Sequence, residues 1–484
     1  MLKTRDILGG DSSIGMSKTR SFKISPLGGS RGQGSKTRGG SRSNRRNASS
    51  PSPSPSPPSP PPPPLRVRHF LRTDNLNDDD NVNGESENFH RAIGPILWWA
   101  QFFGLLPLAG IRSASPSRLK YKRFSLRTAY SVLVAASIFF MATLSVLHMI
   151  RTFNAEAFEV RGGIAAATVG AMFYGNSFFG TIAFLWLSPR WVTLQNDWRA
   201  MERFVDGNVS RAPRLRWKFI IISTVVLLFS LIEHILSVVN NSVDFEWGTS
   251  NSTFPNFLRI YTAASHAFIL ESVEYNFALG IYIFVASKIA TFTWNFTDLF
   301  VMLVSTGLAE RYKSLNARVI ATTKKRPSSI DWCEFRSYYA VLSTLVKKVD
   351  NDISPVILLS FANNLYFICL QLLNGLSGPA DGNFLGYLYF FGSFTFLVAR
   401  TCGVTFLTAR INDQSKTVLP LLYNCSSSTY NIETQRLQYQ LTTDDVALTG
   451  LRFFSITRNF MLALAGAIVT YEVVLLQFNI AMHK

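Results

Sequence analysis

The sequence predicts an all-α membrane protein with seven transmembrane helices, a cytosolic N-terminus and an extracellular C-terminus. Three observations lead to this fold class. Of the 484 residues, 47% are hydrophobic and only 16% are charged, against roughly a quarter in soluble domains. The hydrophobic residues gather in runs of about 20 or more, the length that a spanning helix needs. Lys and Arg are abundant in alternate gaps between these runs, as in cytosolic loops of membrane proteins.

Residues 1–88 differ in composition from the rest of the chain. They are rich in Ser, Gly and Arg, then in Pro and Ser from Pro51 to Pro64, and then acidic from Asp74 to Glu87. Such a segment can bury too little apolar area to offset chain entropy, so we expect a disordered cytosolic tail. Its Pro tract is interpreted as a stiff spacer, with docking to an SH3-like partner as the alternative.

Residues 89–127 are predicted to form a re-entrant or interfacial segment on the cytosolic side. The stretch from Phe89 to Ile111 is apolar enough to resemble a first span. It contains Gly94, Pro95 and further Gly and Pro residues, which argue against one continuous helix. We therefore begin the six-span bundle at residue 128 and end it at residue 454.

Seven spans are expected after this segment. They are Ala129–Ile150, Gly163–Leu187, Lys218–Val239, a fourth that starts near Phe257, Ile353–Leu376, Phe384–Ile411 and Ser455–Met482.

The fourth span is difficult because apolar sequence continues from Phe257 to Ala309. As one helix, these residues would extend for about 80 Å, far beyond a bilayer core of about 30 Å. Positive charge decides the count: the gap 310–350 holds nine Lys and Arg, whereas 240–258 holds none. One long helix places every basic gap on one side, so we predict a single fourth helix that projects into the cytosol. Glycosylation sequons at Asn240 and Asn251 also suit an external 240–258 loop.

A second long helix is predicted before and through the fifth span. Apolar residues recur at steps of three and four from Trp332 to Val349, as on one face of a helix. The fourth and fifth helices together would build a cytosolic anchor layer. This layer would serve equally well for subunit assembly or for packing within one subunit.

No catalytic motif is present in the sequence. It has no GxSxG, HExxH or P-loop, and no Cys and His spacing typical of a metal site. An enzyme is therefore not predicted, and neither a cofactor nor a metal is expected. The net charge of +18 lies between spans rather than in a nucleic-acid-binding pattern, so the expected surroundings are a lipid bilayer and not nucleic acid.

Polar residues inside the predicted spans are costly, so they are candidate ligand contacts. The candidates are Tyr174, Glu233, His234, His266, Glu271, Glu274, Asn364, Gln371, Asn374 and Tyr387. Given the predicted topology, they gather in the outer leaflet and suggest an outward-facing cavity. Carboxylates, amides and imidazoles suit hydroxyl groups, and aromatic faces suit sugar rings, so a neutral polyhydroxylated ligand is favoured. The alternative for each residue is an interhelical hydrogen bond.

The last predicted span contains a specific pattern, Thr470-Tyr471, then five intervening residues, then Gln477-Phe478. It resembles the signature of insect gustatory receptors. His90–Pro95 and Ile353–Pro355, with the stretches that follow them, resemble the sugar-receptor branch. The similarity covers about residues 89–484. Glu472 departs from the mostly apolar pattern between the two halves of the signature.

The resemblance implies a tetrameric, ligand-gated, non-selective cation channel in the plasma membrane of gustatory neurons, gated by sugars, with homomeric or mixed subunits. It places residues 455–484 at the central pore. Gly466, Thr470, Val474, Gln477 and Ala481 then form one helical stripe suited to a water-lined path.

Within this interpretation, Thr470, Val474, Gln477 and Phe478 are the expected pore and gate residues. Glu472 is expected off the pore axis. A seven-span G-protein-coupled receptor is the alternative, opposed by the charge distribution and by missing motifs of that class. A solute transporter is less favoured because no internal repeat is evident.

Overall fold

The computed structural model is all-helical apart from two short hairpins. It describes residues 88–152, 165–206, 214–246, 248, 253–271, 273–325, 330–375, 384–427 and 429–482. Residues 1–87 of the predicted disordered tail and the sequon at Asn251 therefore lie outside the described residues, whereas Asn88, the last residue of that tail, is buried. Among the described residues, five helices are long and apolar enough to cross a membrane: α3, α5, α8, α9 and the segment of α10 and α11. The predicted second and seventh spans are not among the five.

The helical elements have the following bounds. They are α2 (Phe89–Phe102), α3 (Leu126–Thr152), α4 (Ala165–Asp206), α5 (Leu215–Asn240), α6 (Phe254–Ser265), α7 (Ala267–Leu270), α8 (Phe277–Lys325), α9 (Trp332–Gly375), α10 (Phe384–Lys416), α11 (Leu419–Tyr423), α12 (Ile432–Thr443) and α13 (Arg458–Met482). Two antiparallel hairpins pair β1 (Leu108–Ala109) with β2 (Lys120–Tyr121), and β3 (Thr449–Gly450) with β4 (Phe454–Ser455); a 3-10 turn η1 spans Pro116–Arg118.

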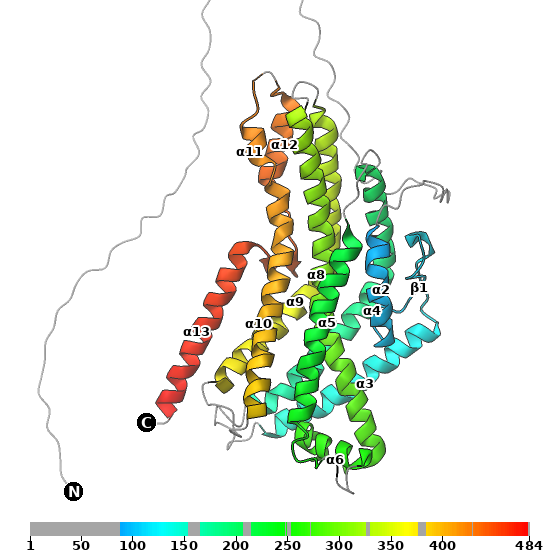
Figure 1. The fold of residues 1–484 in the computed structure, drawn as a ribbon, viewed down its shortest axis with the longest axis vertical. Coiled ribbons are helices and arrows are strands. Elements are labelled where there is room, and N and C mark those ends of the chain that lie inside the picture. Colours follow the sequence, from blue (N-terminus) through cyan, green and yellow to red (C-terminus); the bar gives the residue numbers. More distant parts are fainter. Residues whose placement is uncertain are drawn as a thin grey trace, which may run out of the picture. The chain divides into compact units, whose positions relative to one another are not determined.

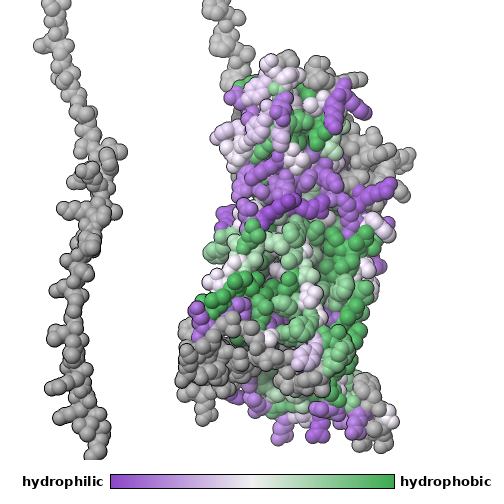
Figure 2. Space-filling view, turned by 60° about the vertical axis from the view of Figure 1, so that its left-hand side comes forward, coloured by the Kyte–Doolittle hydropathy of each residue, from purple (hydrophilic) through white to green (hydrophobic). Residues whose placement is uncertain are grey.

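The long helices run side by side, with α6 at one end of the bundle and α11 and α12 at the other (Figure 1). The space-filling view shows a broad hydrophobic belt over the α6 half and a band of hydrophilic side chains directly above it (Figure 2). At about 1.5 Å per residue, the 49 residues of α8 extend far beyond a bilayer core of about 30 Å. The polar half is therefore a layer outside the bilayer, which we call the anchor layer.

The prediction of one continuous fourth helix from Phe257 is wrong. The apolar run is divided into α6, α7 and α8, and the backbone leaves helical geometry at His266, with φ −136° and ψ 35°. The side chain of Asn276 accepts a hydrogen bond of 2.8 Å from the backbone N–H of Leu279, as an N-cap does, and α8 begins there. With 12 residues, α6 is too short to cross the bilayer, so this break adds no crossing.

The prediction that one continuous helix runs before and through the fifth span is confirmed. The apolar stripe from Trp332 and the later span belong to one helix of 44 residues, α9. The stripe residues Phe335, Leu342 and Val349 are all buried. In the anchor layer, the carboxylate of Glu433 on α12 pairs with Arg336 of α9 at 2.6 Å. Although burial alone would raise it, hydrogen bonds from Arg336 and Arg436 lower the pKa of Glu433.

The segment 89–127 contains a helix where the sequence suggests breaks. The chain is not one helix from Phe89 to Ile111, since α2 ends at Phe102, but Gly94 and Pro95 lie inside α2. Proline has no backbone N–H, so Pro95 leaves the carbonyl four residues earlier without its helical hydrogen bond. Pro95 is on the exposed face of α2, so this carbonyl lies on the side away from the core. At Gly94, a Cβ would lie 2.8 Å from the carbonyl oxygen of Ile111, so close packing requires glycine.

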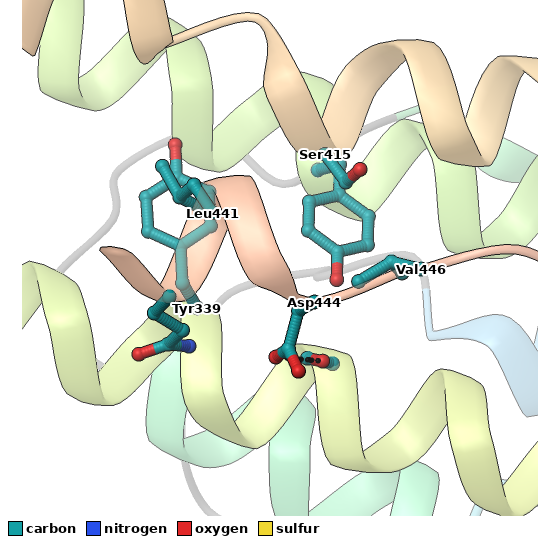
Figure 3. Close-up of a pocket in the computed structure, with 8 residues that line it drawn as sticks. Tyr339, Ser415, Leu441, Asp444 and Val446 are labelled. Carbon is teal, nitrogen blue, oxygen red and sulfur yellow. Dashed lines mark hydrogen bonds between the residues drawn. The ribbon is translucent and has the colours of Figure 1, made fainter. Parts of the chain in front are cut away.

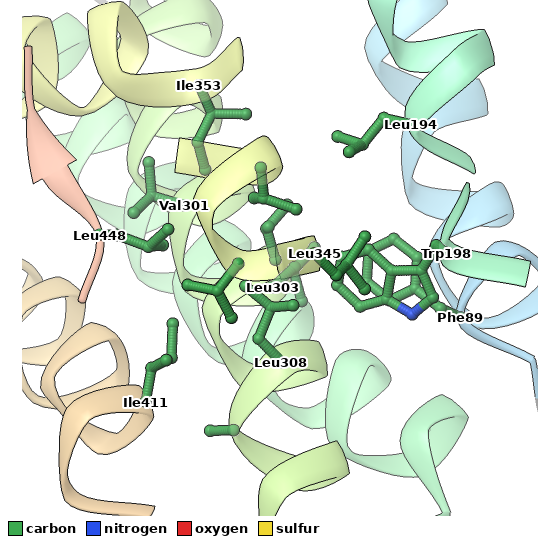
Figure 4. Packing of buried hydrophobic residues seen from close by; sticks show 14 of the residues in the cluster. Phe89, Leu194, Trp198, Val301, Leu303, Leu308, Leu345, Ile353, Ile411 and Leu448 are labelled. Carbon is green, nitrogen blue, oxygen red and sulfur yellow. The ribbon is translucent and has the colours of Figure 1, made fainter. Parts of the chain in front are cut away.

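The main apolar core lies where α2, α4, α8 and α9 meet (Figure 4). The ring of Phe89 stacks on Trp198 with ring centroids 3.8 Å apart. Both rings rest on α8 at Gly307, where a Cβ would lie 2.7 Å from the ring of Phe89. Every residue of α8 from Asn295 to Tyr312 is buried, so α8 is the central helix of the bundle.

Candidate functional site

The predicted ligand residues separate into an interior network and a peripheral group. One chain of hydrogen bonds joins three helices. Ser393 on α10 donates to Glu233 on α5 at 3.2 Å, and Gln371 on α9 donates to Ser393 at 3.1 Å. The Oε1 atom of Gln371 is buried and has no hydrogen-bond partner among the described residues. It is an acceptor available to a hydroxyl group, because a buried polar atom without a partner is costly.

A buried ion pair that sequence reasoning missed lies at the centre of the network. The guanidinium Nε of Arg400 on α10 lies 2.7 Å from Oδ2 of Asp298 on α8, with side chains 3% and 0% exposed. The predicted residue Asn364 donates to Asp298 at 3.0 Å and accepts from Arg400 at 3.3 Å. Arg400 also interacts electrostatically with Glu233, which links the two parts of the network.

The signal for this pair was present in the sequence. Asp298 lies within the apolar run 257–309, and Arg400 lies within the predicted sixth span. Charged residues inside a membrane are costly and default to a functional role, so their positions alone mark both as candidate functional residues. Lys288 on α8 is a third charged residue that sequence reasoning missed. Its Nζ donates to the hydroxyl of Tyr261 at 3.0 Å and lies 4.3 Å from the ring centroid of Phe284.

His266 and Tyr174 form a second predicted pair, at the junction of α6 and α7. The hydroxyl of Tyr174 on α4 lies 2.6 Å from Nε2 of His266, and the hydroxyl of Ser265 lies 2.6 Å from Nδ1. Both ring nitrogens are thus occupied in a buried position. Nε2 of His234, by contrast, is buried and has no hydrogen-bond partner among the described residues. Lys288 interacts electrostatically with both imidazoles.

The remaining predicted residues lie at the periphery. Glu271 pairs with His148 at 2.9 Å, but its side chain is 57% exposed. Glu274, Asn374 and Tyr387 are exposed and outside the network. Because α6 and α7 are separate from α8, the two acidic residues belong to a connecting segment and not to a span.

The cavity beside the network is small in the part of the chain that the structure describes. A cavity of about 10 Å³ beside the network is lined by side chains that include Asn176, Thr293, Trp294 and Asn363. This volume holds about one water molecule, and a sugar ring needs several times more. The Nδ2 of Asn176 donates to Oδ1 of Asn363 at 2.6 Å across α4 and α9. A sugar ring would fit in this cavity only if the surrounding helices separated.

A second cavity of about 10 Å³ lies in the anchor layer (Figure 3). Tyr339, Ser415, Leu441 and Asp444 are among its lining residues, and the Asp444 carboxylate accepts a hydrogen bond of 3.1 Å from Ser343. Among the described residues, no group of three His, Cys, Asp or Glu side chains could hold a metal ion.

The predicted pore residues lie on α13, which packs on α9 and α10 and is mostly exposed (Figure 1). Thr470, Val474 and Gln477 are exposed, whereas the side chain of Phe478 lies outside the described part of the structure. Oε1 of Glu472 is buried without a hydrogen-bond partner among the described residues, and Glu472 interacts electrostatically with Cys369 of α9. Glu472 therefore lies on the side of α13 that faces α9, and its position off the pore axis stays a prediction.

The fold is similar to that of a solved insect olfactory receptor. The structure resembles the olfactory receptor OR5 from Machilis hrabei, with a TM-score of 0.58, 14% identity and coverage of 80% of this chain and 100% of that chain. The OR5 structure in complex with eugenol matches with a TM-score of 0.56, 18% identity and coverage of 81% and 98%.

The sequence comparisons identify the particular family. Residues 71–484 match the family described as "Trehalose receptor", and the chain belongs to this family of insect gustatory receptors. It is 31% identical to the Drosophila melanogaster "Gustatory receptor for sugar taste 64a", over 81% of this chain and 84% of that protein. It is 32% identical to the Drosophila melanogaster "Gustatory receptor 5a for trehalose", over 83% and 89%.

Proposed function

We propose that this protein is a sugar-gated, non-selective cation channel subunit that acts as a sweet-taste receptor in the plasma membrane of gustatory neurons. The observation that carries the proposal is the contrast between α13 and the rest of the bundle. Thr470, Val474 and Gln477 are exposed on a helix that packs on α9 and α10 of its subunit. Such a helix suits a pore shared by subunits of a homo- or heterotetramer.

The sugar would bind in the interior network. The unpartnered Oε1 of Gln371 on α9 and Nε2 of His234 on α5 supply an acceptor and an imidazole. Glu233, the neighbour of His234 on α5, is linked to Gln371 through Ser393. The aromatic side chains beside the network, such as Trp294, suit the apolar face of a sugar ring. Entry would separate α5, α9 and α10, and this movement would reach α13 through its contacts with α9 and α10.

The experiment expresses the chain in cells that lack other receptors and records current while trehalose, sucrose and glucose are applied. Direct gating predicts sugar-evoked cation current in excised patches without nucleotide. A current that requires GTP would overturn the channel proposal in favour of G-protein coupling. If the chain alone is silent, co-expression with a second sugar receptor of the family must restore the current; failure with every such partner also counts against the proposal.

A matched pair of variants tests the binding site. Gln371→Ala removes the free acceptor, and Asn374→Ala alters an exposed amide on the same helix. We expect Gln371→Ala to raise the half-maximal sugar concentration by about tenfold, the effect of losing one hydrogen bond to a buried group. Asn374→Ala should change it less than about twofold. Equal potency in both variants would remove Gln371 from the site.

A further inference from the structure

A basic surface with exposed aromatic side chains surrounds the start of α3. Residues 112–127 contain six Lys and Arg and no Asp or Glu. All six cations are exposed, and none forms an ion pair among the described residues. The charge is therefore not neutralised within the described protein, unlike the charge of the anchor layer, where Arg311 pairs with Glu202 at 2.5 Å.

Large hydrophobic side chains lie among these cations. Phe124 is 100% exposed and Leu126 is 91% exposed, directly after Lys122 and Arg123. Trp99 on α2 is also exposed, at 57%. Fully exposed aromatic residues next to cations are typical of segments at the boundary between lipid tails and headgroups.

The contacts show that these groups form one surface. The guanidinium of Arg112 lies 3.8 Å from the ring centroid of Trp98 on α2. Arg127 at the start of α3 donates to the carbonyl of Leu108 in the β1–β2 hairpin at 2.6 Å. The hydroxyl of Tyr130 donates to the carbonyl of Phe102 at 2.7 Å and ties α3 to the end of α2.

The position of the hairpin fits a lipid boundary. Figure 1 places α2, the hairpin and the start of α3 next to one another on one side of the fold, near mid-height. Helix α3 begins at Leu126, three positions after Arg123, and Arg127 lies in its first turn. The cations therefore lie at the level where the chain enters the membrane.

We propose that residues 112–127, together with Trp98 and Trp99, form a binding site for anionic phospholipid. The exposed cations would contact the phosphate and acidic headgroup, and Phe124 and Leu126 would enter the acyl region. A zwitterionic lipid would make the apolar contacts but would carry no net negative charge. An anionic lipid would make the same apolar contacts and would also pair with the exposed cations. The site is separate from the polar network in the bundle and does not depend on the ligand proposed there.

The test uses the full-length protein in detergent and native mass spectrometry with equal amounts of dioleoyl phosphatidylserine and dioleoyl phosphatidylcholine. The wild type should retain phosphatidylserine in preference to phosphatidylcholine. Lys120→Gln/Lys122→Gln/Arg123→Gln should reduce phosphatidylserine retention by at least about tenfold, because each surface cation adds attraction to an anionic headgroup. Equal retention of both lipids by the wild type would overturn the proposal.

The matched control removes the same charge elsewhere. Lys313, Lys324 and Lys325 are exposed on α8, at positions without exposed aromatic neighbours in the described contacts. Lys313→Gln/Lys324→Gln/Lys325→Gln should keep the lipid preference. If both triple variants lost phosphatidylserine retention equally, the net charge of the protein would explain the effect, and the proposal of a defined site would be overturned.

Phe124→Ser separates a lipid from a soluble anion. It removes the exposed ring and keeps all six cations, so phosphatidylserine retention should fall severalfold. Glycerophosphoserine, which carries the headgroup without acyl chains, should compete weakly with the wild type. Full competition by this soluble compound, together with unchanged retention by Phe124→Ser, would show a phosphate site and not a lipid site.

Discussion

The helices α9 and α13 both cross the hydrophobic half of the protein, but they are packed in opposite ways. Helix α9 is buried along much of its length, from Trp332 to Leu373, and contributes Asn364 and Gln371 to the polar network. Helix α13 contacts α9 and α10 on one side and exposes Leu462, Val469 and Val474. The bundle side chains of α9 are thus largely buried within one chain, whereas α13 leaves much of its surface exposed.

This difference separates two kinds of substitution. Changes around α9 should act on the stability of the bundle, because they disturb groups without access to solvent. Changes on the exposed face of α13 should leave stability intact and act on ion flow. Three predictions test the separation, from the largest expected effect to the smallest.

The largest effect is expected from Arg400→Ala. It leaves the fully buried carboxylate of Asp298 without its cation, which costs about 3–5 kcal/mol. Thermal unfolding of the detergent-solubilised protein, followed by fluorescence-detected size exclusion, should show a strong destabilisation and low surface expression. Arg400→Leu/Asp298→Leu should regain much of this stability, because both charges are removed together. If the single and double variants are equally unstable, the ion pair is not the cause.

An intermediate effect is expected at the joint between α9 and α13. Asp350 on α9 accepts hydrogen bonds from the backbone N–H of Thr449 at 2.6 Å and from its hydroxyl at 2.9 Å. The hairpin that follows holds Leu451 and Arg452 at positive φ, an unfavourable geometry for residues other than glycine. Asp350 thus fixes the segment that leads into α13.

Asp350→Asn should shift the sugar concentration for half-maximal current by about tenfold, corresponding to roughly 1.4 kcal/mol in the balance between closed and open states. Surface expression should remain near that of the wild type. Asp445→Asn is the control, because Asp445 is exposed and its hydrogen bond to Asn412 is long, at 3.4 Å. A shift of the same size in Asp445→Asn would mean that the joint has no special role.

The smallest effect on stability is expected from Gln477→Ala on the exposed face of α13. Because the side chain is exposed in the subunit, the free energy of unfolding should change by less than about 0.5 kcal/mol. Relative sodium and potassium permeability, or block by a large organic cation, should nevertheless change. Unaltered permeation with normal expression would take Gln477 out of the pore.

The sequence predicted the helical class and the long α9, because these follow from periodicity and from the composition of each segment. It failed for the fourth helix, where a single apolar run contains three helices. The break at His266 depends on local hydrogen bonds from Ser265 and on contact with Tyr174 of α4, which is distant in sequence. Neither interaction can be predicted from the hydrophobicity of the segment alone.

The candidate site was predicted in part for a similar reason. Polar residue types inside the predicted spans identified Glu233, Asn364 and Gln371 as candidates. All three belong to the interior network. The sequence placed Glu274, Asn374 and Tyr387 with them, but these face outward. Helical position gives the face of a residue relative to its own helix, and only packing decides which face is inside.

By itself, the sequence determined that this chain enters the membrane, which segments are apolar and, through Thr470, Tyr471, Gln477 and Phe478, which family signature it carries. These properties depend on residues close together in the chain. The tertiary structure alone decided that Asp298 and Arg400, 102 positions apart in the sequence, form one buried pair. The physical reason is that the cost of a buried charge is set by the partner that packing brings to it, and that partner lies on another helix.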